Sequence, residues 1–328
     1  MNDIARVAGV TESTVSRALA NSPRVKLETR RRIQRIAREM EYVPSAIARG
    51  LATKRTSTIG VVLVDMADQF SAGVVGALDS NARDLGYSVI LSTYGRSPSG
   101  ELNAIRLLVQ QRVDAIIVPD PLAADSTLPQ LERIGVPIIL LNKKSYAFSV
   151  GTDNIDGARQ AVDHLCGLGH RRIAYIGGSR SEEEDTERRA GYEYALTGYG
   201  ICRDPSLITE GDGWHEGGQR CMQQLLALQN PPSAVFCFND LTASGALLAA
   251  YRAGVRVPQD LSVVGFDDSS LASLLVPPLT TVAQQCDQMA RLALQMALDL
   301  MDGHPSPARF TLPGKLVVRQ STAPPPNS

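Results

Sequence analysis

Apolar runs and amphipathic segments alternate from Thr58 almost to the end of the 328-residue chain. The apolar runs predict β-strands at Ile59–Val64, Ser88–Ser92, Ala115–Val118, Pro137–Leu141, Arg172–Ile176, Ala234–Phe238 and Leu261–Gly265. The amphipathic segments predict helices at Ala72–Leu85, Glu101–Gln111, Ile155–Leu168, Asp185–Tyr199, Glu216–Leu228, Asp240–Ala253 and Gln285–Met301. Short apolar strands that alternate with helices are typical of parallel sheets covered on both faces. The strands exceed what one sheet holds comfortably, so we predict an α/β body of two lobes.

Residues 1–44 have a different pattern, in which short helical segments follow one another without strands. Gly9 allows a sharp turn after the first segment, because a positive φ is cheap for glycine. Asn21-Ser22-Pro23 breaks the chain after the second segment. We predict helices at Asp3–Ala8, Glu12–Ala20 and Leu27–Met40, with Thr11 as the N-cap of the second. This all-α head has the arrangement of a helix-turn-helix.

The second predicted helix has an apolar and a polar side. Val15 and Leu19 can pack against the third helix, which leaves the polar residues outside. In a helix-turn-helix this helix lies in the major groove of DNA, where Arg17 can pair with guanine and Glu12 can accept from cytosine. The alternative is a plain three-helix bundle with a polar surface. The candidate DNA-binding residues of the head are Thr11, Glu12, Ser13, Thr14, Ser16, Arg17 and Arg24.

Charge is distributed unevenly along the chain. The whole chain has a net charge of −1, yet residues 1–60 hold 12 Lys and Arg against 5 Asp and Glu. A basic head on an acidic body indicates that a polyanion contacts the head alone. From charge alone, a basic surface that is simply solvated explains the pattern equally well. Together with the helix-turn-helix pattern, it favours double-stranded DNA as the partner.

Other composition features argue against membrane, metal and catalytic roles. No apolar run reaches the roughly 18 residues of a membrane span, and the first residues resemble no secretory leader. The five cysteines form no CxxC pair, and the four histidines are scattered. We therefore expect a cytoplasmic protein without a cofactor, a metal site or an enzymatic activity.

Six short motifs lie in the first 51 residues, at Asp3-Ile4-Ala5, Ala8-Gly9-Val10, Thr14-Val15-Ser16-Arg17, Val25 with Thr29-Arg30, Tyr42-Val43-Pro44 and Ala48-Arg49-Gly50-Leu51. At this spacing they resemble the LacI/GalR (lac repressor) family of transcription regulators. The resemblance implies a hinge helix at residues 45–53 that orders on DNA, with Arg49 as a DNA contact. It also implies that Leu51 is a minor-groove wedge, which would unstack a base step and bend the duplex.

The similarity continues to about residue 320, through Thr58-Ile-Gly-Val-Val, Glu187-Arg188-Arg189-Ala190-Gly191-Tyr192, Phe238-Asn239-Asp240 and Val263-Val-Gly-Phe-Asp-Asp268. This part resembles a periplasmic sugar-binding protein. The resemblance implies a head at 1–44, a hinge at 45–57 and an effector-binding and dimerisation body at 58–320. Lobe 1 would hold 58–152 and 283–311, and lobe 2 would hold 153–282 and 312–320. We expect the proline-rich tail, 321–328, to be disordered.

Polar residues follow several predicted strands of the body, and ligands bind at the carboxyl ends of parallel strands. Carboxylates and amides there can accept hydrogen bonds from sugar hydroxyls, and an arginine supplies a planar donor. The candidate effector-binding residues are Phe70, Asn142, Arg188, Trp214, Asn239, Asp240 and Asp267. Asp240 has a structural alternative as a helix cap, and Trp214 has one as a surface-packing residue.

Head and body together predict a transcription regulator, most simply a repressor, that binds operator DNA as a homodimer. Its effector would be a sugar or sugar derivative, with a purine as the alternative, and a protein co-regulator would be a further possibility. A different reading is a cytosolic α/β protein or enzyme that binds sugars or nucleotides without regulating DNA.

Overall fold

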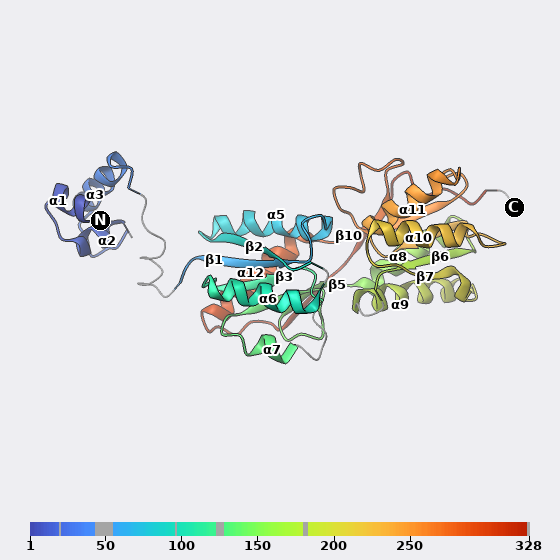
Figure 1. The fold of residues 1–328 in the computed structure, drawn as a ribbon, viewed down its shortest axis with the longest axis horizontal. Coiled ribbons are helices and arrows are strands. Elements are labelled where there is room, and N and C mark those ends of the chain that lie inside the picture. Colours follow the sequence, from blue (N-terminus) through green and yellow to red (C-terminus); the bar gives the residue numbers. More distant parts are fainter. Residues whose placement is uncertain (20, 43–54, 96, 123–127, 180–182, 327–328) are drawn as a thin grey trace. The chain divides into compact units, whose positions relative to one another are not determined.

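A computed structural model describes residues 1–19, 21–42, 55–95, 97–122, 128–179 and 183–326. The chain divides into two compact units, Met1–Thr56 and Ser57–Ser328. The first unit contains the helical head, and the second contains two α/β lobes (Figure 1). Among the described residues, no helix is long and apolar enough to cross a membrane.

The head consists of α1 (Asn2–Ala8), α2 (Glu12–Leu19) and α3 (Leu27–Glu39), each ending within one residue of its prediction. Gly9 has φ 60° and terminates α1, as its position in the motif predicts. The three helices share a small core in which Val15 of α2 and Ile33 of α3 are fully buried. This core holds α2 by its apolar side and leaves its polar side in solvent.

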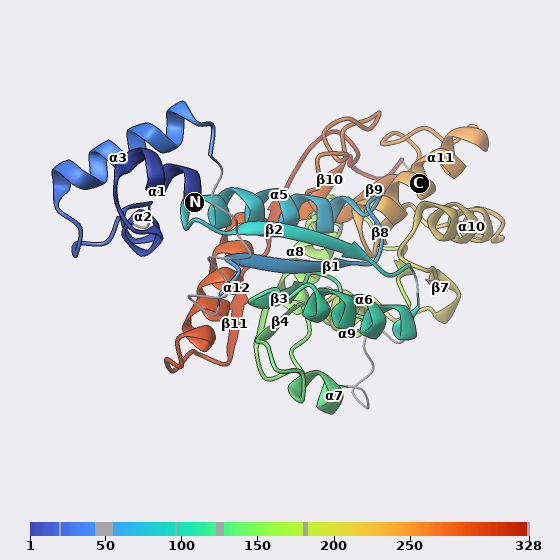
Figure 2. The ribbon, with the colours of Figure 1, turned by 60° about the vertical axis from the view of Figure 1, so that its left-hand side comes forward.

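Lobe 1 is built on a six-stranded sheet with the order β11-β5-β4-β3-β1-β2, in which every neighbouring pair is parallel. Its strands are β1 (Thr58–Leu63), β2 (Ser88–Thr93), β3 (Ala115–Val118), β4 (Ile138–Leu141), β5 (Ser149–Thr152) and β11 (Arg309–Leu312). Its helices are α5 (Gln69–Asp84), α6 (Pro98–Gln110), α7 (Leu128–Glu132) and α12 (Cys286–Met301). Figure 2 shows α5 and α6 on opposite faces of this sheet.

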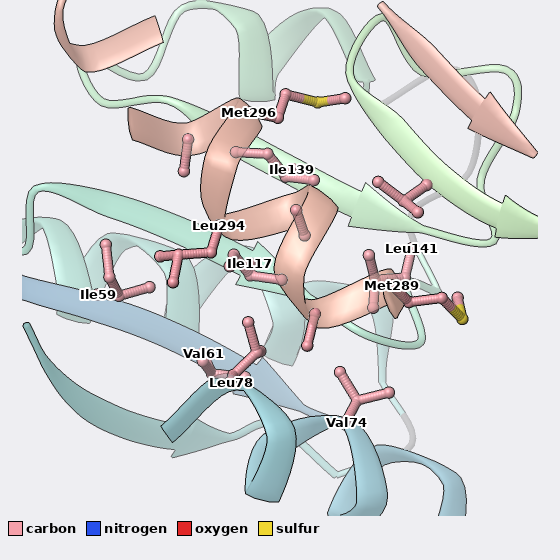
Figure 3. Packing of buried hydrophobic residues seen from close by; sticks show 14 of the residues in the cluster. Ile59, Val61, Val74, Leu78, Ile117, Ile139, Leu141, Met289, Leu294 and Met296 are labelled. Atoms are coloured by element: carbon pink, nitrogen blue, oxygen red, sulfur yellow. The ribbon is translucent and has the colours of Figure 1, made fainter. Parts of the chain in front are cut away.

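The core of lobe 1 joins distant parts of the sequence. Ile117 and Ile139 of the sheet share one buried cluster with Leu294 of α12 and Leu78 of α5, and all four are almost completely buried (Figure 3). Each such side chain contributes about 1.5–3 kcal/mol by leaving water. Helix α12 therefore belongs to lobe 1, although all the helices of lobe 2 precede it in the chain.

Lobe 2 has a second six-stranded sheet, with the order β12-β10-β9-β8-β6-β7. Its strands are β6 (Ile173–Gly177), β7 (Ile208–Glu210), β8 (Ala234–Cys237), β9 (Ser262–Asp267), β10 (Thr280–Ala283) and β12 (Lys315–Val317). Its helices are α8 (Asn154–Gly167), α9 (Glu183–Gly198), the 3-10 helix η1 (Pro205–Leu207), α10 (His215–Leu226) and α11 (Asp240–Arg252). Only the edge strand β12 runs antiparallel to its neighbour among these described pairs.

The expectation that residues 321–328 are disordered is wrong for residues 321–326. The Ser321 side chain is fully buried, its hydroxyl donates to the Val263 carbonyl at 2.6 Å, and its carbonyl accepts from the Val263 amide. The Ala323 carbonyl lies 2.9 Å from Nε2 of the buried His170 and accepts from the Ser262 hydroxyl at 3.0 Å. The proline-rich composition suggested disorder, and the prediction failed because the partners that hold these residues are distant in the sequence.

Candidate functional sites

The polar side of α2 presents the residues predicted to contact DNA. Val15 and Ala18 are fully buried on its other side. Of the seven candidates in the head, Thr14 is half-buried and the other six are exposed, namely Thr11, Glu12, Ser13, Ser16, Arg17 and Arg24. A rigid helix with one free polar face and a free N-terminus has the form of a major-groove reader.

Three hydroxyls gather where α2 begins. The Thr11 hydroxyl lies 2.9 Å from that of Ser13 and 3.0 Å from that of Thr14. The Thr11 carbonyl accepts from the amides of Thr14 and Val15, which starts the helix. Hydroxyls at a helix N-terminus can exchange these contacts for phosphate oxygens or base edges.

Two arginines of α3 hold the head together, a role that the charge count did not reveal. Arg32 donates to the Ala8 carbonyl at the end of α1 at 2.6 Å. Arg30 donates to the Asn21 carbonyl after α2 at 3.0 Å. Not every basic residue of the head is therefore available to DNA. The predicted hinge, with Arg49 and Leu51, lies outside the described residues.

A cavity lies between the two lobes and is lined by both. Its lining residues are Asp68, Phe70, Asp120, Asn142, Glu184, Arg188, Phe238, Asn239, Asp267 and Gln284. Five of the seven predicted effector-binding residues are among them, namely Phe70, Asn142, Arg188, Asn239 and Asp267. Most lining residues follow the carboxyl ends of strands, as expected for a ligand site of parallel sheets.

Arg188 of α9 is the central cation of this cavity, and its side chain is almost fully buried. One guanidinium nitrogen donates to the Phe238 carbonyl at 2.6 Å, and Nε donates to Oδ1 of Asn154 at 3.0 Å. The guanidinium carbon lies 3.9 Å from the Phe266 ring centroid and 4.5 Å from that of Phe238. Another nitrogen lies 3.9 Å from Asp267. These contacts fix a planar donor at the cavity wall.

Asp267 begins a buried hydrogen-bond chain that crosses between the lobes. Gln284 donates from Nε2 to Asp267 at 2.8 Å and accepts at Oε1 from the Thr152 hydroxyl at 2.6 Å. The Thr152 amide donates to Oδ1 of Asn142 at 3.0 Å. Asp267 has φ 114°, a region that non-glycine residues rarely adopt, whereas Asn142 has φ 54°, in the left-handed region that asparagine tolerates. Backbone strain at Asp267 is typical of a functional site.

Enclosure changes the acid strength of the carboxyl groups in the cavity. Burial raises the pKa of Asp267 well above its usual range, and the Arg188 guanidinium acts against this. Burial also raises the pKa of Asp68, whose oxygens accept from the Phe70 and Ser71 amides and cap α5. Glu184 has its pKa raised to about 7, first by burial and further by neighbouring glutamates. The cavity is thus rich in carboxyl groups that enclosure makes weaker acids.

Asp240 and Trp214, which the sequence suggested as effector contacts, are not among the lining residues. The Asp240 carboxylate is almost fully buried and accepts from the Thr281 hydroxyl at 2.6 Å and the Ser269 amide at 2.7 Å. Trp214 lies at the start of α10 in lobe 2 and packs against a core cluster of lobe 1. In this structure Asp240 is engaged within lobe 2 and Trp214 covers lobe 1, and an effector contact of either residue stays a prediction.

Five lining residues were not predicted, namely Asp68, Asp120, Glu184, Phe238 and Gln284. Asp68, Asp120 and Phe238 follow strands β1, β3 and β8, so the strand-end rule could have found them. Glu184 lies in the first turn of α9, and Gln284 lies between β10 and α12. No local sequence signal marks those two. Among the described residues, no cluster of histidine, cysteine and acidic side chains could hold a metal ion.

The chain is similar to known proteins over nearly its full length. Residues 1–45 match the bacterial regulatory proteins of the lacI family, and residues 162–322 match the periplasmic binding protein-like domain. The HTH-type transcriptional repressor CytR of Escherichia coli (strain K12) is 35% identical over 327 residues, which cover 98% of this chain and 96% of CytR. The HTH-type transcriptional regulator GalS of Salmonella typhimurium is 37% identical over 301 residues, covering 91% of this chain and 88% of GalS.

Solved structures give the same result. The lac repressor dimer bound to operator and the anti-inducer ONPF matches with a TM-score of 0.88 and 33% identity, covering 98% of both chains. The complex of the transcriptional regulator CelR with cellobiose matches with a TM-score of 0.75 and 34% identity, covering 97% of this chain and 98% of CelR. These relatives are transcription regulators rather than enzymes, and the predicted family and fold class are confirmed. The chain belongs to the lacI family of bacterial regulatory proteins and is a DNA-binding transcription regulator.

Proposed function

We propose that this regulator binds a small, uncharged, polar effector in the cavity between its lobes, and that the effector changes the affinity of the head for operator DNA. The observation that carries this proposal is that one cavity is lined by both lobes around the fixed guanidinium of Arg188. A ligand that contacts Asn142 of lobe 1 and Arg188 of lobe 2 stabilises one lobe arrangement over others. The effector is released unchanged, so the protein is not an enzyme.

The charges of the cavity define the class of effector. Asp68, Asp120, Glu184 and Asp267 supply four carboxyl groups against the single guanidinium of Arg188. Because enclosure raises the pKa of Asp68, Glu184 and Asp267, these groups disfavour added charge and can hydrogen-bond an uncharged ligand with many hydroxyls, such as a sugar or a nucleoside. Phe70 and Phe238 add apolar surface for a sugar or base face. The cellobiose complex of CelR supports the sugar class.

The cavity is smaller than an effector. Its volume is about 40 Å³, whereas small-molecule sites typically have roughly 300–1,000 Å³. Effector entry therefore requires the lobes to move. Movement of this kind links effector to DNA, and the linkage is reciprocal, because operator binding must change effector affinity by the same factor.

The head reads the operator through α2. Arg17 pairs with a guanine, Glu12 accepts from a cytosine amino group, and the hydroxyls around Thr11 contact phosphate or base edges. The exposure of these side chains supports the assignment. Arg49 as a DNA contact and Leu51 as a minor-groove wedge rest on the family resemblance alone.

The regulator acts as a homodimer on a near-palindromic operator, because two-fold protein symmetry is matched by two DNA half-sites. The structural match to the operator-bound lac repressor dimer supports this assembly. Its site of action is the cytoplasm, where its operator would be.

A thermal-shift screen tests the effector proposal. The panel contains sugars, nucleosides and purines, each beside its phosphorylated form. A ligand at about 100 times its Kd adds about 2.7 kcal/mol of stability, which raises the melting temperature by several degrees. We expect unphosphorylated hits whose shift is lost in Arg188→Met and kept in Arg189→Met, since Arg189 pairs with Glu193 within α9. Hits that survive Arg188→Met, or only phosphorylated hits, would refute this site.

A further inference from the structure

Two lysines and two glutamates face each other across the lobes, beside the cavity. Lys144 Nζ of lobe 1 lies 2.6 Å from Oε1 of Glu187 of lobe 2. Lys143 Nζ lies 3.8 Å from Oε2 of Glu183, which also accepts from the Ser145 hydroxyl at 3.3 Å. The lysines belong to the turn after β4, and the glutamates belong to the first turns of α9.

Each side of this ionic contact is joined to a cavity residue. Glu187 also accepts from Asn154 at 2.9 Å through its second oxygen, and Asn154 accepts in turn from Nε of Arg188. On the other side, Lys143 directly follows Asn142. Glu187 is therefore linked to the guanidinium of Arg188 through Asn154, and the two lysines directly follow Asn142 in the chain.

We infer that Lys143 and Lys144 clamp Glu183 and Glu187, and that this ionic clamp holds the lobes closed and thereby positions Asn142 and Arg188 around the cavity. The four side chains retain only 12–30% of their exposure, so solvent and salt screen them less than a surface pair. They are positioning residues. The role of the ionic clamp in lobe closure does not depend on the proposed function, whereas its influence on effector binding rests on that function.

The lysines also offset repulsion within α9. Its first turns hold Glu183, Glu184 and Glu187, and the mutual repulsion of these glutamates contributes to the raised pKa of Glu184. Without a facing lysine, α9 would present uncompensated negative charge to lobe 1. Charge reversal at Lys144 should therefore separate the lobes more strongly than neutralisation does.

Trp214, the chain's only tryptophan, can report this separation. It extends from lobe 2 and packs against the lobe 1 cluster that contains Tyr94 and Leu131. When the lobes separate, its indole loses that cover and becomes more accessible to acrylamide. Acrylamide quenching of the full-length chain, without effector or DNA, therefore measures lobe closure.

We expect Lys144→Gln to lower the ratio of closed to open protein by about fivefold, the effect of one favourable ion pair. Lys144→Glu should open the lobes further, with stronger quenching and a red-shifted emission. The charge swap Lys144→Glu with Glu187→Lys re-forms an ion pair across the lobes and should recover most of the native quenching, although the Asn154 contact of Glu187 is lost. Arg189→Glu is the matched control, because it makes the same charge change within lobe 2 and should leave quenching unchanged.

The clamp is overturned if Lys144→Glu quenches like the native chain, or if the swap stays as open as the single variants. Far-UV circular dichroism shows whether each variant is folded, and the milder Lys144→Gln serves if Lys144→Glu is not. Because no ligand is used, failure here leaves the effector proposal standing. Conversely, a working clamp with an empty thermal-shift screen would count against the effector proposal alone.

Discussion

Asp240→Asn separates the structural reading of this residue from the ligand-binding one. In the native chain both carboxylate oxygens are occupied inside lobe 2, by the Thr281 hydroxyl and the Ser269 amide. Burial raises the pKa of Asp240 from an ordinary value of 3.8 to about 6, against the hydrogen bonds from Thr281 and Ser269, which lower it. An asparagine fits the same space, accepts from Ser269 and donates to Thr281.

The sign and size of the effect follow from the two pKa values. Between pH 3.8 and about 6 the unfolded chain releases the Asp240 proton while the folded chain keeps it. Stability therefore falls as pH rises through this window and stays lower above it. At about 1.4 kcal/mol for each pKa unit, the loss is on the order of 3 kcal/mol. That corresponds to roughly 5–10 °C in melting temperature for a domain of this size.

The assay is the melting temperature of the native chain and of Asp240→Asn from pH 4 to 8. We expect a shallower decline between pH 4 and 6 in the variant, because the Asp240 contribution is gone while the raised pKa values of Asp68, Glu184 and Asp267 still contribute theirs. Asp260→Asn is the control, because Arg256 holds the pKa of Asp260 at about 2, so the contribution of Asp260 is lost only below about pH 4 and this variant should keep the native slope between pH 4 and 8. The reasoning is refuted if Asp240→Asn declines as steeply as the native chain. A variant that keeps its stability and loses the effector shift would restore Asp240 as a ligand contact.

Three further outcomes can be checked directly. Arg17→Ala should relax the preference at one base position by about 1–3 kcal/mol in operator-library binding, and an unchanged preference would remove Arg17 from base readout. Operator affinity should fall roughly 10³–10⁵-fold between 50 and 200 mM salt if six to ten phosphates are contacted, and a flat response in anisotropy titrations would contradict the interface. Deleting residues 321–328 leaves the Val263 and Thr280 amides without their Ser321 partners. Each loss costs about 1–3 kcal/mol, so an unchanged melting temperature would show that the tail contributes nothing.

The long elements of this fold were predictable because their signals are local. The apolar runs at β1, β3 and β8 mark buried strands, and the helices around them have clear amphipathic periods. The prediction missed the three- and four-residue strands β5, β7, β10, β11 and β12, of which β5 and β11 pair with each other. Since β5 contains Gly151, and β11 follows all the helices of lobe 2, only long-range pairing makes them strands.

The site was predictable to the extent that topology places it. The rule that ligands bind at strand ends found Asn142, Asn239 and Asp267, which line the cavity. It could not tell which carboxylates face the cavity, so it included Asp240, which turns toward Ser269. Gln284 was missed because its importance comes from its place between the lobes, where it joins Asp267 to Thr152.

The passage of the chain back and forth between lobes bears on how the protein is made. Lobe 1 lacks α12 and β11 until residues 286–312 emerge from the ribosome. Lobe 2 lacks β12 and the hydrogen bonds of Ser321 until residues 315–321 emerge. The head, by contrast, has a complete core within its first 42 residues. During translation the DNA-reading part can therefore fold long before the part that would control it. A prematurely terminated chain would be released with a finished head and two unfinished, aggregation-prone lobes.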